Sequence, residues 1–301
     1  MSSPTVSVVI PAYNREDVLT ASVDSVLRQT WTDFEVLIVD DGSTDATREI
    51  AESMTDPRIR VIATSGNTGA SGARNVGVAH AVGDWVAFQD SDDEWLPRKL
   101  EKQMAPLLAD GSDAIAGYCG MVVTGRHFQS EGERPQTLYI PNQRHKAVSG
   151  DIRNTLLTAS LVSTQTLIVR RDLLAEVGGF DEALPALVDW DLTLRLAQHG
   201  SFSFIDEPLV LQFFSENSLT QNLDKRLTAR RAIIDKHRAL FEAAPDALAH
   251  QYRSLAGEER RRGNIAAASE AIAAARKQQP LNLHLALISV YLRARRLFGR
   301  D

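Results

Sequence analysis

The feature that most constrains this chain is the alternation of short apolar runs with helix-length segments over its first 90 residues. Four compact apolar runs predict buried strands: Val6–Ile10, Phe34–Val39, Ile59–Ile62 and Trp85–Phe88. Helices are predicted between them, at Glu16–Gln29, after Thr44 or Asp45 as the cap of the second helix, and at Gly69–Val82. Strands joined by helices of this length form a parallel sheet through right-handed crossovers, so this part of the chain is predicted to be an α/β domain.

Polar residues follow three of these strands at the points where the strands end. Tyr13-Asn14 follows the first strand, Asp40-Asp41 ends the second, and Asp90-Ser91-Asp92-Asp93 comes after the fourth. Ligands of parallel sheets bind beyond the carboxyl ends of the strands. Three polar strand ends at one edge therefore predict a ligand site there.

The remainder of the chain is less regular until its last part. Residues 126–150 are polar and irregular, and we expect a mobile loop of the kind that often closes over a site. Strands return at Thr166–Val169 and Leu209–Phe214, and the pattern after about residue 222 is helical. We therefore predict a domain at 1–222, with halves at 1–110 and 111–222, and a small all-α appendage at 223–301.

Composition excludes some classes of protein. With 301 residues, of which 44% are hydrophobic, the chain can bury a sizeable core. Its net charge is −6, although residues 251–301 hold ten Lys or Arg and four Asp or Glu. The acidic remainder argues against a nucleic-acid partner, whereas the basic tail suits an anionic lipid or protein surface, or is simply a solvated helical face.

The expected location is the cytoplasm. Cys119 is the one cysteine, which fits a reducing compartment. The start of the sequence lacks the pattern of a signal peptide, and the chain has no apolar run of about 18 residues. Peripheral contact with the inner face of the cytoplasmic membrane is compatible with these features.

The acidic cluster at residues 90–93 predicts a metal site. Three aspartates in four residues, directly after an apolar strand, repel one another unless a cation is present. Carboxylate oxygens suit hard divalent cations, and Mg²⁺ or Mn²⁺ keeps positions for water and substrate phosphates. The alternative is a loop that only caps the next helix.

Four stretches at these strand ends resemble the inverting GT-A glycosyltransferases of family 2. They are, in chain order, Val6–Asn14, Val39–Asp45, Asn67–Gly77 and Phe88–Asp93. Weaker matches reach about residue 215, so the resemblance covers roughly two-thirds of the chain. It implies a GT-A fold with a mixed, mostly parallel sheet, and transfer of a sugar from a nucleoside diphosphate sugar.

The resemblance also implies roles for individual residues. Asp92 would be the main metal ligand, Asp90 would lie near the ribose or the metal, and Asp93 would assist at the donor sugar, with Ser91 between them. Asp41 would accept a hydrogen bond from the pyrimidine ring, because a carboxylate can select a ring N–H. The other donor-side residues would be Pro11, Ala12, Tyr13, Asn14, Asp40 and Arg74.

Each donor-side motif also has a purely structural interpretation. Asp41, Ser43 or Asp45 would cap the helix that follows the second strand. The turn after the first strand would be a plain tight turn, and it lacks the glycine pattern of a dinucleotide site. Arg74 would make a surface ion pair instead of offering its planar fork to phosphate or base.

Inverting transfer needs a carboxylate that takes the proton of the acceptor hydroxyl. The stretch Gly178–Leu192 resembles the acceptor-side segment of the family, in which Glu-Asp precedes an aromatic residue. Asp189 matches the catalytic base, whereas Val188 stands in place of the Glu, and Asp191 is the second choice. Asp189 would also suit the N-cap of a helix at Trp190–Gln198.

Two tryptophans near these motifs have two interpretations. Trp95 follows the acidic cluster and Trp190 follows the candidate base, so each would either stack on a sugar or pack in the core. The Gln-x-x-Arg-Trp motif of processive members of the family is absent from this sequence. The resemblance therefore implies addition of one sugar or a few, followed by release.

Residues 249–282 resemble one 34-residue tetratricopeptide repeat. Gly263-Asn264 would form the turn between two helices, and Pro280 would end the second. A third helix at Leu283–Leu297 would carry an apolar face with three arginines beside it. Such an appendage would dock on the catalytic domain, a partner protein, a second copy of the chain or an anionic membrane.

The predicted function is inverting, metal-dependent, non-processive transfer from a UDP-sugar to a glycan or glycolipid hydroxyl in surface polysaccharide synthesis. A nucleotidyltransferase would share the acidic metal site, but it would need a Gly-rich basic loop where Ala12-Tyr13-Asn14 stands. A non-catalytic sugar-nucleotide-binding or scaffold protein is the other alternative, because Val188 departs from the family pattern.

Overall fold

The computed structural model describes residues 4–124, 138–141, 148–213 and 222–298. The chain divides into two compact units. The first unit comprises Met1–Arg153, Leu161–Ala183 and Val188–Asn217, and the second comprises Asn154–Ser160, Leu184–Leu187 and Ser218–Asp301. Two short segments from the middle of the chain thus belong to the second unit, which the sequence pattern did not indicate.

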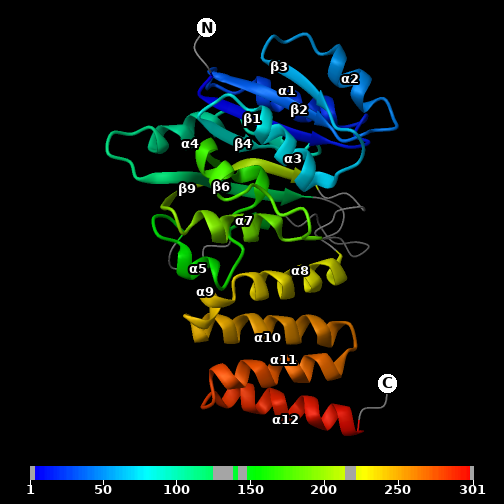
Figure 1. Ribbon diagram of the computed structural model, residues 1–301, viewed down its shortest axis with the longest axis vertical. Helices are drawn as coiled ribbons and strands as arrows, with labels where there is room; N and C mark the ends of the chain where they lie inside the picture. Colours follow the sequence, from blue (N-terminus) through cyan, green and yellow to red (C-terminus); the bar gives the residue numbers. More distant parts are fainter. Residues whose placement is uncertain (1–3, 125–137, 142–147, 214–221, 299–301) are drawn as a thin grey trace. The chain divides into compact units, whose positions relative to one another are not determined.

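The first unit is built on a mixed sheet that has nine strands in the described residues (Figure 1). The strand order is β3-β2-β1-β4-β8-β6-β9-β5, and β7 pairs with β6. The strands are β1 Val6–Ala12, β2 Phe34–Asp40, β3 Ile59–Ala63, β4 Trp85–Phe88, β5 Glu94–Trp95, β6 Ala114–Thr124, β7 Leu138–Ile140, β8 Ile168–Arg170 and β9 Ser201–Phe213. The first four strands are parallel, as predicted, and β8 joins β4 in the antiparallel direction.

Seven α-helices of the described chain precede β9. They are α1 Leu19–Leu27, α2 Thr47–Ser53, α3 Gly69–His80, α4 Lys99–Leu107, α5 Arg153–Leu156, α6 Arg171–Glu176 and α7 Val188–Leu196, and a 3₁₀ turn covers Thr164–Thr166. α1 starts later than predicted because the turn before it bonds to the turn before α2. The Oε2 atom of Glu16, for example, accepts a hydrogen bond from Ala46 N at 2.9 Å. α2, by contrast, begins close to its predicted cap Asp45, whose Oδ1 atom accepts from Thr47 N at 2.9 Å.

The core follows the two-residue period of the strands. Val6, Val8 and Ile10 of β1 belong to a buried cluster that also contains Val23 of α1 and Leu100 of α4. The residues between them along β1 point to the opposite face of the sheet. Both faces of β1 are therefore buried, which explains why its sequence is apolar except for Ser7.

The sheet extends beyond the strands that the sequence indicated. The predicted strand at Leu209–Phe214 is the end of a much longer β9, and β6 was not predicted at all. The prediction of an irregular loop over residues 126–150 was wrong at β7, because Leu138–Ile140 forms a strand that pairs with Met121–Val123. Residues 126–137 and 142–147 of that loop, and its proposed role as a lid, lie outside the described residues.

The helical pattern predicted after residue 222 is confirmed. The helices of this part are α8 Leu223–Lys236, α9 Arg238–Glu242, α10 Pro245–Arg261, α11 Ile265–Gln278 and α12 Leu283–Phe298 (Figure 1). The turn between α10 and α11 is formed by Gly263, with φ +78°, and by Asn264, whose side chain caps α11 by accepting from Ala267 N. None of the helices in the described ranges is long and apolar enough to cross a membrane.

Helix α3 lies unusually close to the sheet at Gly77. A Cβ atom on Gly77 would lie 2.3 Å from Cγ1 of Val9 in β1, well inside van der Waals contact. We expect Gly77→Ala to lower the free energy of unfolding by about 1–3 kcal/mol, measured by urea denaturation, because the core must shift to admit the methyl group. Gly66→Ala is the control, since a Cβ there meets nothing within 4 Å. Equal stability of the two variants would contradict this account of α3 packing.

Candidate active site

The parallel strands end in register at one edge of the sheet. Ala12 of β1 pairs with Asp40 of β2, which pairs with Ala63 of β3. The backbone N–H of Asp41 donates to Ala12 O at 2.8 Å, so the pairing continues into the turns. β4 lies on the other side of β1 and runs in the same direction. The predicted convergence of the three polar strand ends is therefore confirmed.

The turn after β1 is tied to the turn after β2 by Asn14. Its Oδ1 atom accepts from Thr44 N at 2.8 Å, and its own N–H donates to Ser43 Oγ at 3.1 Å. Asn14 has φ +52°, a left-handed conformation that Asn tolerates better than most residues. Pro11-Ala12 forms the buried end of β1, whereas the side chain of Tyr13 is exposed. Tyr13 and Asn14 are therefore the exposed residues of this motif.

Asp41 anchors the start of α3. Its Oδ1 atom accepts hydrogen bonds from Thr68 N at 2.9 Å, Thr68 Oγ1 at 2.7 Å and Thr64 Oγ1 at 2.9 Å. Asp41 and its neighbour Asp40 are both buried, and Asp40 accepts a bond from Ser43 N at 3.3 Å. Asp41 therefore holds the residue before α3, whereas of the three predicted capping residues Asp45 bonds to the start of α2, by accepting from Thr47 N at 2.9 Å.

Arg74 of α3 connects the acidic cluster with the segment that contains Phe180. Its Nη2 atom donates to Asp90 Oδ1 at 2.5 Å, and its guanidinium lies 5.5 Å from the centre of the Phe180 ring. The side chain is only 9% exposed, and its Nε atom has no hydrogen-bond partner among the described residues. Arg74 therefore makes a largely buried ion pair at the strand ends and not a surface one.

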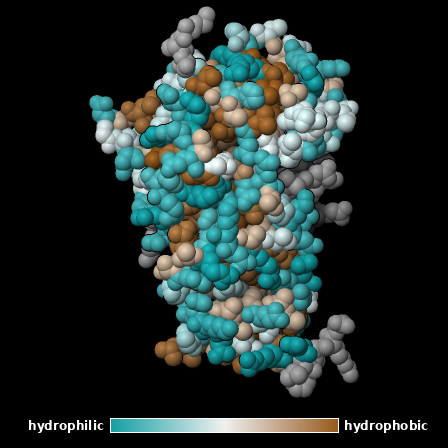
Figure 2. Space-filling model, viewed as in Figure 1, coloured by the Kyte–Doolittle hydropathy of each residue, from teal (hydrophilic) through white to brown (hydrophobic). Residues whose placement is uncertain are grey.

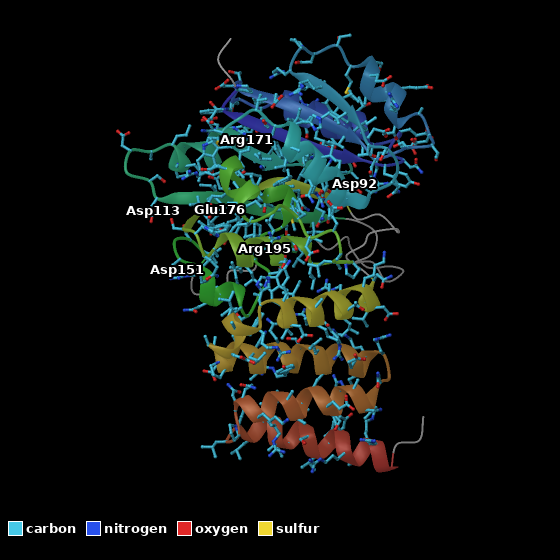
Figure 3. The ribbon with its side chains drawn as sticks, in the orientation of Figure 1. Asp92, Asp113, Asp151, Arg171, Glu176 and Arg195 are labelled. Atoms are coloured by element: carbon cyan, nitrogen blue, oxygen red, sulfur yellow. The ribbon has the colours of Figure 1, made fainter. Side chains whose placement is uncertain are left out.

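Asp92 lies at the carboxyl edge of the parallel strands and is labelled in Figure 3. Its Oδ2 atom is 3.7 Å from Nη2 of Arg15, a residue that the sequence did not single out. Burial and the negative charge of Asp90 raise the pKa of Asp92, while the charges of Arg15 and Arg74 act in the opposite direction. Asp92 therefore lies where added positive charge would stabilise its ionised form.

Asp93 has a different environment from Asp92. It is buried, and its carboxylate accepts from Gln165 Nε2 and from Phe213 N, both at 3.1 Å. Burial, followed by the charges of Asp90 and Asp92, raises the pKa of Asp93 to about 9. Asp93 therefore connects the acidic cluster to the end of β9. Ser91 is also buried.

The acidic cluster fits a divalent cation as a partial ligand set. Among the described residues, no three His, Cys, Asp or Glu side chains are grouped so that they would hold a metal by themselves. Asp90 and Asp92 are the pair that suits a cation, because their repulsion contributes to the raised pKa of Asp92. Two carboxylates are enough for Mg²⁺ or Mn²⁺, whose remaining positions are filled by water and phosphate oxygens.

Asn75 fixes the acceptor-side segment against α3. Its Nδ2 atom donates to Phe180 O at 2.9 Å and to Glu182 Oε1 at 2.8 Å, and its Oδ1 atom accepts from Phe180 N at 2.8 Å. Gly179 has φ +66°, and a Cβ there would lie 2.5 Å from Asn75 Oδ1. The adjacent residues Arg74 and Asn75 thus contact the acidic cluster and the acceptor-side segment from one turn of α3.

Asp191 has a structural environment. It is fully buried, and its Oδ2 atom accepts from Arg195 Nη2 at 2.7 Å within α7; Figure 3 labels Arg195. Arg195 also donates to Gly179 O at 2.8 Å and to Val177 O. Asp191 therefore holds the arginine that binds the turn after α6.

Asp189 lies in the first turn of α7, which begins one residue earlier, at Val188. Burial raises the pKa of Asp189 to about 6, the Trp190 N–H and the charge of Arg74 lower it, and the charge of Asp90 raises it. Leu187, two residues before Asp189, has φ +57°, an uncommon conformation for a branched side chain. Backbone strain of this kind is found at functional sites.

The two tryptophans pack in the core. Trp190 is 1% exposed and Trp95 is 3% exposed, and Nε1 of Trp95 donates to Gln165 O at 3.2 Å. The ammonium group of Lys99 lies 3.7 Å from the centre of the Trp95 ring. The core interpretation of both residues is therefore correct, and neither is available to stack on a sugar.

Comparison with known proteins identifies the family. The chain matches the model of glycosyl transferase family 2 over residues 7–178, and it belongs to this family. It is 32% identical over 211 residues to an uncharacterized glycosyltransferase of Rickettsia typhi, a match that covers 69% of this chain and 63% of the relative. The chain thus spans less than two-thirds of the length of that relative.

A second relative has a more specific name. Over 112 residues the chain is 40% identical to the Escherichia coli UDP-Glc:alpha-D-GlcNAc-diphosphoundecaprenol beta-1,3-glucosyltransferase WfgD, covering 37% of this chain and 44% of WfgD. The matched region is therefore less than half of either protein.

Solved structures show the same fold. TarS 1-349 of S. aureus, in complex with UDP-GlcNAc, superposes with a TM-score of 0.70 at 23% identity, covering 96% of this chain and 87% of TarS 1-349. The mannosyltransferase PcManGT of Pyrobaculum calidifontis, in complex with GDP-Man and Mn2+, gives 0.62 at 19% identity, covering 100% and 89%. The predicted GT-A-like fold is confirmed.

Because their environments differ, replacement of Asp191 should destabilise the fold, whereas replacement of Asp189 should not. At pH 8, Asp191→Asn should lower the free energy of unfolding by about 2 kcal/mol, because Arg195 loses its buried partner. The pKa of Asp189 is higher in the folded chain than its ordinary value, so ionisation of Asp189 at pH 8 costs stability, and Asp189→Asn should not destabilise. Urea denaturation of the two variants checks this, and the reverse order would contradict the assignment.

Proposed function

We propose that this chain is an inverting glycosyltransferase that uses a nucleoside diphosphate sugar and a divalent cation. The observation that carries the proposal is the position of Arg74, which bonds Asp90 Oδ1 at 2.5 Å and lies 5.5 Å from the ring of Phe180 in the acceptor-side segment. The charges of Arg74 and Asp90 both act on the pKa of Asp189, so the candidate base lies within range of the candidate cation site. A single displacement with a departing diphosphate needs both groups at one reacting centre.

Asp92 and Asp90 would hold Mg²⁺ or Mn²⁺. Arg74 bonds Oδ1 of Asp90, and Arg15 faces Oδ2 of Asp92. In this proposal the cation would therefore bind Oδ2 of Asp90 and Oδ1 of Asp92. When bound, the cation would supply positive charge that stabilises the diphosphate leaving group. The Mn2+ in the PcManGT complex supports a cation in this fold.

The donor in this proposal is a UDP-sugar. WfgD is named for the donor UDP-Glc, and TarS 1-349 was solved in complex with UDP-GlcNAc. PcManGT, by contrast, is in complex with GDP-Man. Tyr13 has an exposed side chain at the strand ends and would contact the nucleoside. Asp41 would accept from the base through Oδ2, because Oδ1 accepts the three shorter hydrogen bonds. We also propose that residues 1–222 form the catalytic domain and that residues 223–301 form the helical appendage.

Asp189 would act as the base. The acceptor oxygen attacks the anomeric carbon, the carbon–oxygen bond to the diphosphate breaks, and the proton of the hydroxyl passes to Asp189. With a pKa of about 6, Asp189 is largely ionised at pH 7.5 yet basic enough to accept a proton in the transition state. The acceptor would be a glycan or lipid-linked glycan in polysaccharide synthesis, a class to which the WfgD acceptor belongs by its name.

The pKa of Asp189 predicts the pH dependence of transfer. Since protonated Asp189 cannot accept a proton, kcat/KM for sugar transfer should rise with pH through an apparent pKa near 6 and then level off. Asp189→Asn should lower kcat by about 100-fold or more, while donor binding measured by calorimetry stays unchanged. A variant that transfers sugar at the full rate would show that another group is the base.

The proposed cation site predicts metal-dependent binding of the donor. Mn²⁺ and UDP together should raise Tm of the chain, because ligands that bind only the folded state stabilise it, and EDTA should remove the effect. Asp92→Asn should lose most of this shift. The matched control is Asp110→Asn, which removes one exposed carboxylate elsewhere. An undiminished shift in Asp92→Asn would refute the role of this carboxylate.

A further inference from the structure

The last described helix has an apolar face that points to solvent. Leu283, Leu287, Val290 and Tyr291 lie at the helical spacing of one face, which we call the α12 outer face. Their exposed fractions are 80%, 69%, 66% and 46%, and Leu281 just before the helix is 94% exposed. Figure 2 shows brown, hydrophobic side chains at the α12 edge of the second unit.

The opposite face of α12 already packs within the second unit. Leu285, Ser289 and Leu292 are 2%, 5% and 2% exposed, and α12 lies against α11. Folding of the helix therefore does not require the outer face. Exposed leucines and valine on one stripe, as opposed to single scattered residues, mark a surface that binds something.

The arginines of α12 are its charged residues in the described chain, and they lie toward its C-terminal end. Arg293, Arg295 and Arg296 are exposed, and the stretch Leu283–Phe298 contains no Asp or Glu. The guanidinium of Arg295 lies 5.9 Å from the centre of the Tyr291 ring, so a cation lies at the rim of the apolar stripe. An apolar stripe flanked by arginines has the pattern of a helix that lies in the plane of a membrane interface.

We propose that the α12 outer face docks on an anionic lipid surface. The apolar side chains would enter the boundary between headgroups and acyl chains, and the arginines would contact the phosphates. A second copy of the chain suits this face less well. Two-fold packing of α12 on itself would gather arginines from both copies, and α12 has no carboxylate to neutralise them.

This inference does not depend on the proposed function. Vesicle binding by α12 requires no donor, cation or acceptor, so it can succeed where transfer fails, and the reverse also holds. If both are correct, the helix would bring the chain to the surface where a lipid-linked acceptor is found.

The test is co-sedimentation of the 301-residue chain with vesicles. Wild type should bind vesicles of phosphatidylglycerol and phosphatidylcholine in equal parts, bind pure phosphatidylcholine far less, and lose binding as salt rises. Leu287→Glu with Val290→Glu should weaken the partition at least about ten-fold. The control, Ala266→Glu with Ala273→Glu, adds the same charge to exposed positions of α11 and should stay within about two-fold.

Three results would overturn the proposal. One is the absence of binding to anionic vesicles, and another is equal weakening in the control variant. The third is a wild-type dimer in light scattering that the Leu287/Val290 variant converts to monomer, without vesicle binding, which would identify a second copy as the occupant. Circular dichroism of each variant verifies that α12 remains folded.

Discussion

The candidate site depends on the contact of Arg74 with Asp90. The ion pair is available because α3 lies against β1 at a glycine, so the buried arginine reaches the turn after β4. The same guanidinium lies over Phe180, whose backbone is held by Asn75, the next residue along α3. One turn of helix therefore fixes the acidic cluster and the acceptor-side segment in a common frame. Both members of the ion pair act on the pKa of Asp189, which Arg74 lowers and Asp90 raises.

The aspartates of this region divide by their partners. Asp41 and Asp191 accept hydrogen bonds from protein donors that join separate segments, so these two carboxylates hold the fold together, and in the proposal Asp41 also binds the base. Asp92 and Asp189 have raised pKa values with burial as the main cause. Burial of a carboxylate without full compensation costs free energy, and such groups are found where a ligand or a reaction supplies the compensation.

Much of this arrangement followed from local patterns in the sequence. The parallel strands and their polar ends could be predicted because apolar runs and helical spacing are local, and parallel topology brings strand ends together. β6 was missed because Ala114–Thr124 contains two glycines and no clear alternation, and its pairing with the distant β9 is a tertiary contact. The roles of Arg15, Gln165 and Asn75 required three-dimensional contacts, although Asn75 lies inside a motif that the sequence did indicate.

The most direct test is diffraction from crystals grown with Mn²⁺ and UDP, using the anomalous signal of manganese. The account predicts a manganese peak bonded to a carboxylate oxygen of Asp92 or Asp90, at about 2.2 Å, and shared with the diphosphate, with the uracil near Asp41. A manganese peak away from residues 90–93, or a nucleotide bound elsewhere than at the carboxyl edge of β1, β2 and β4, would contradict the account.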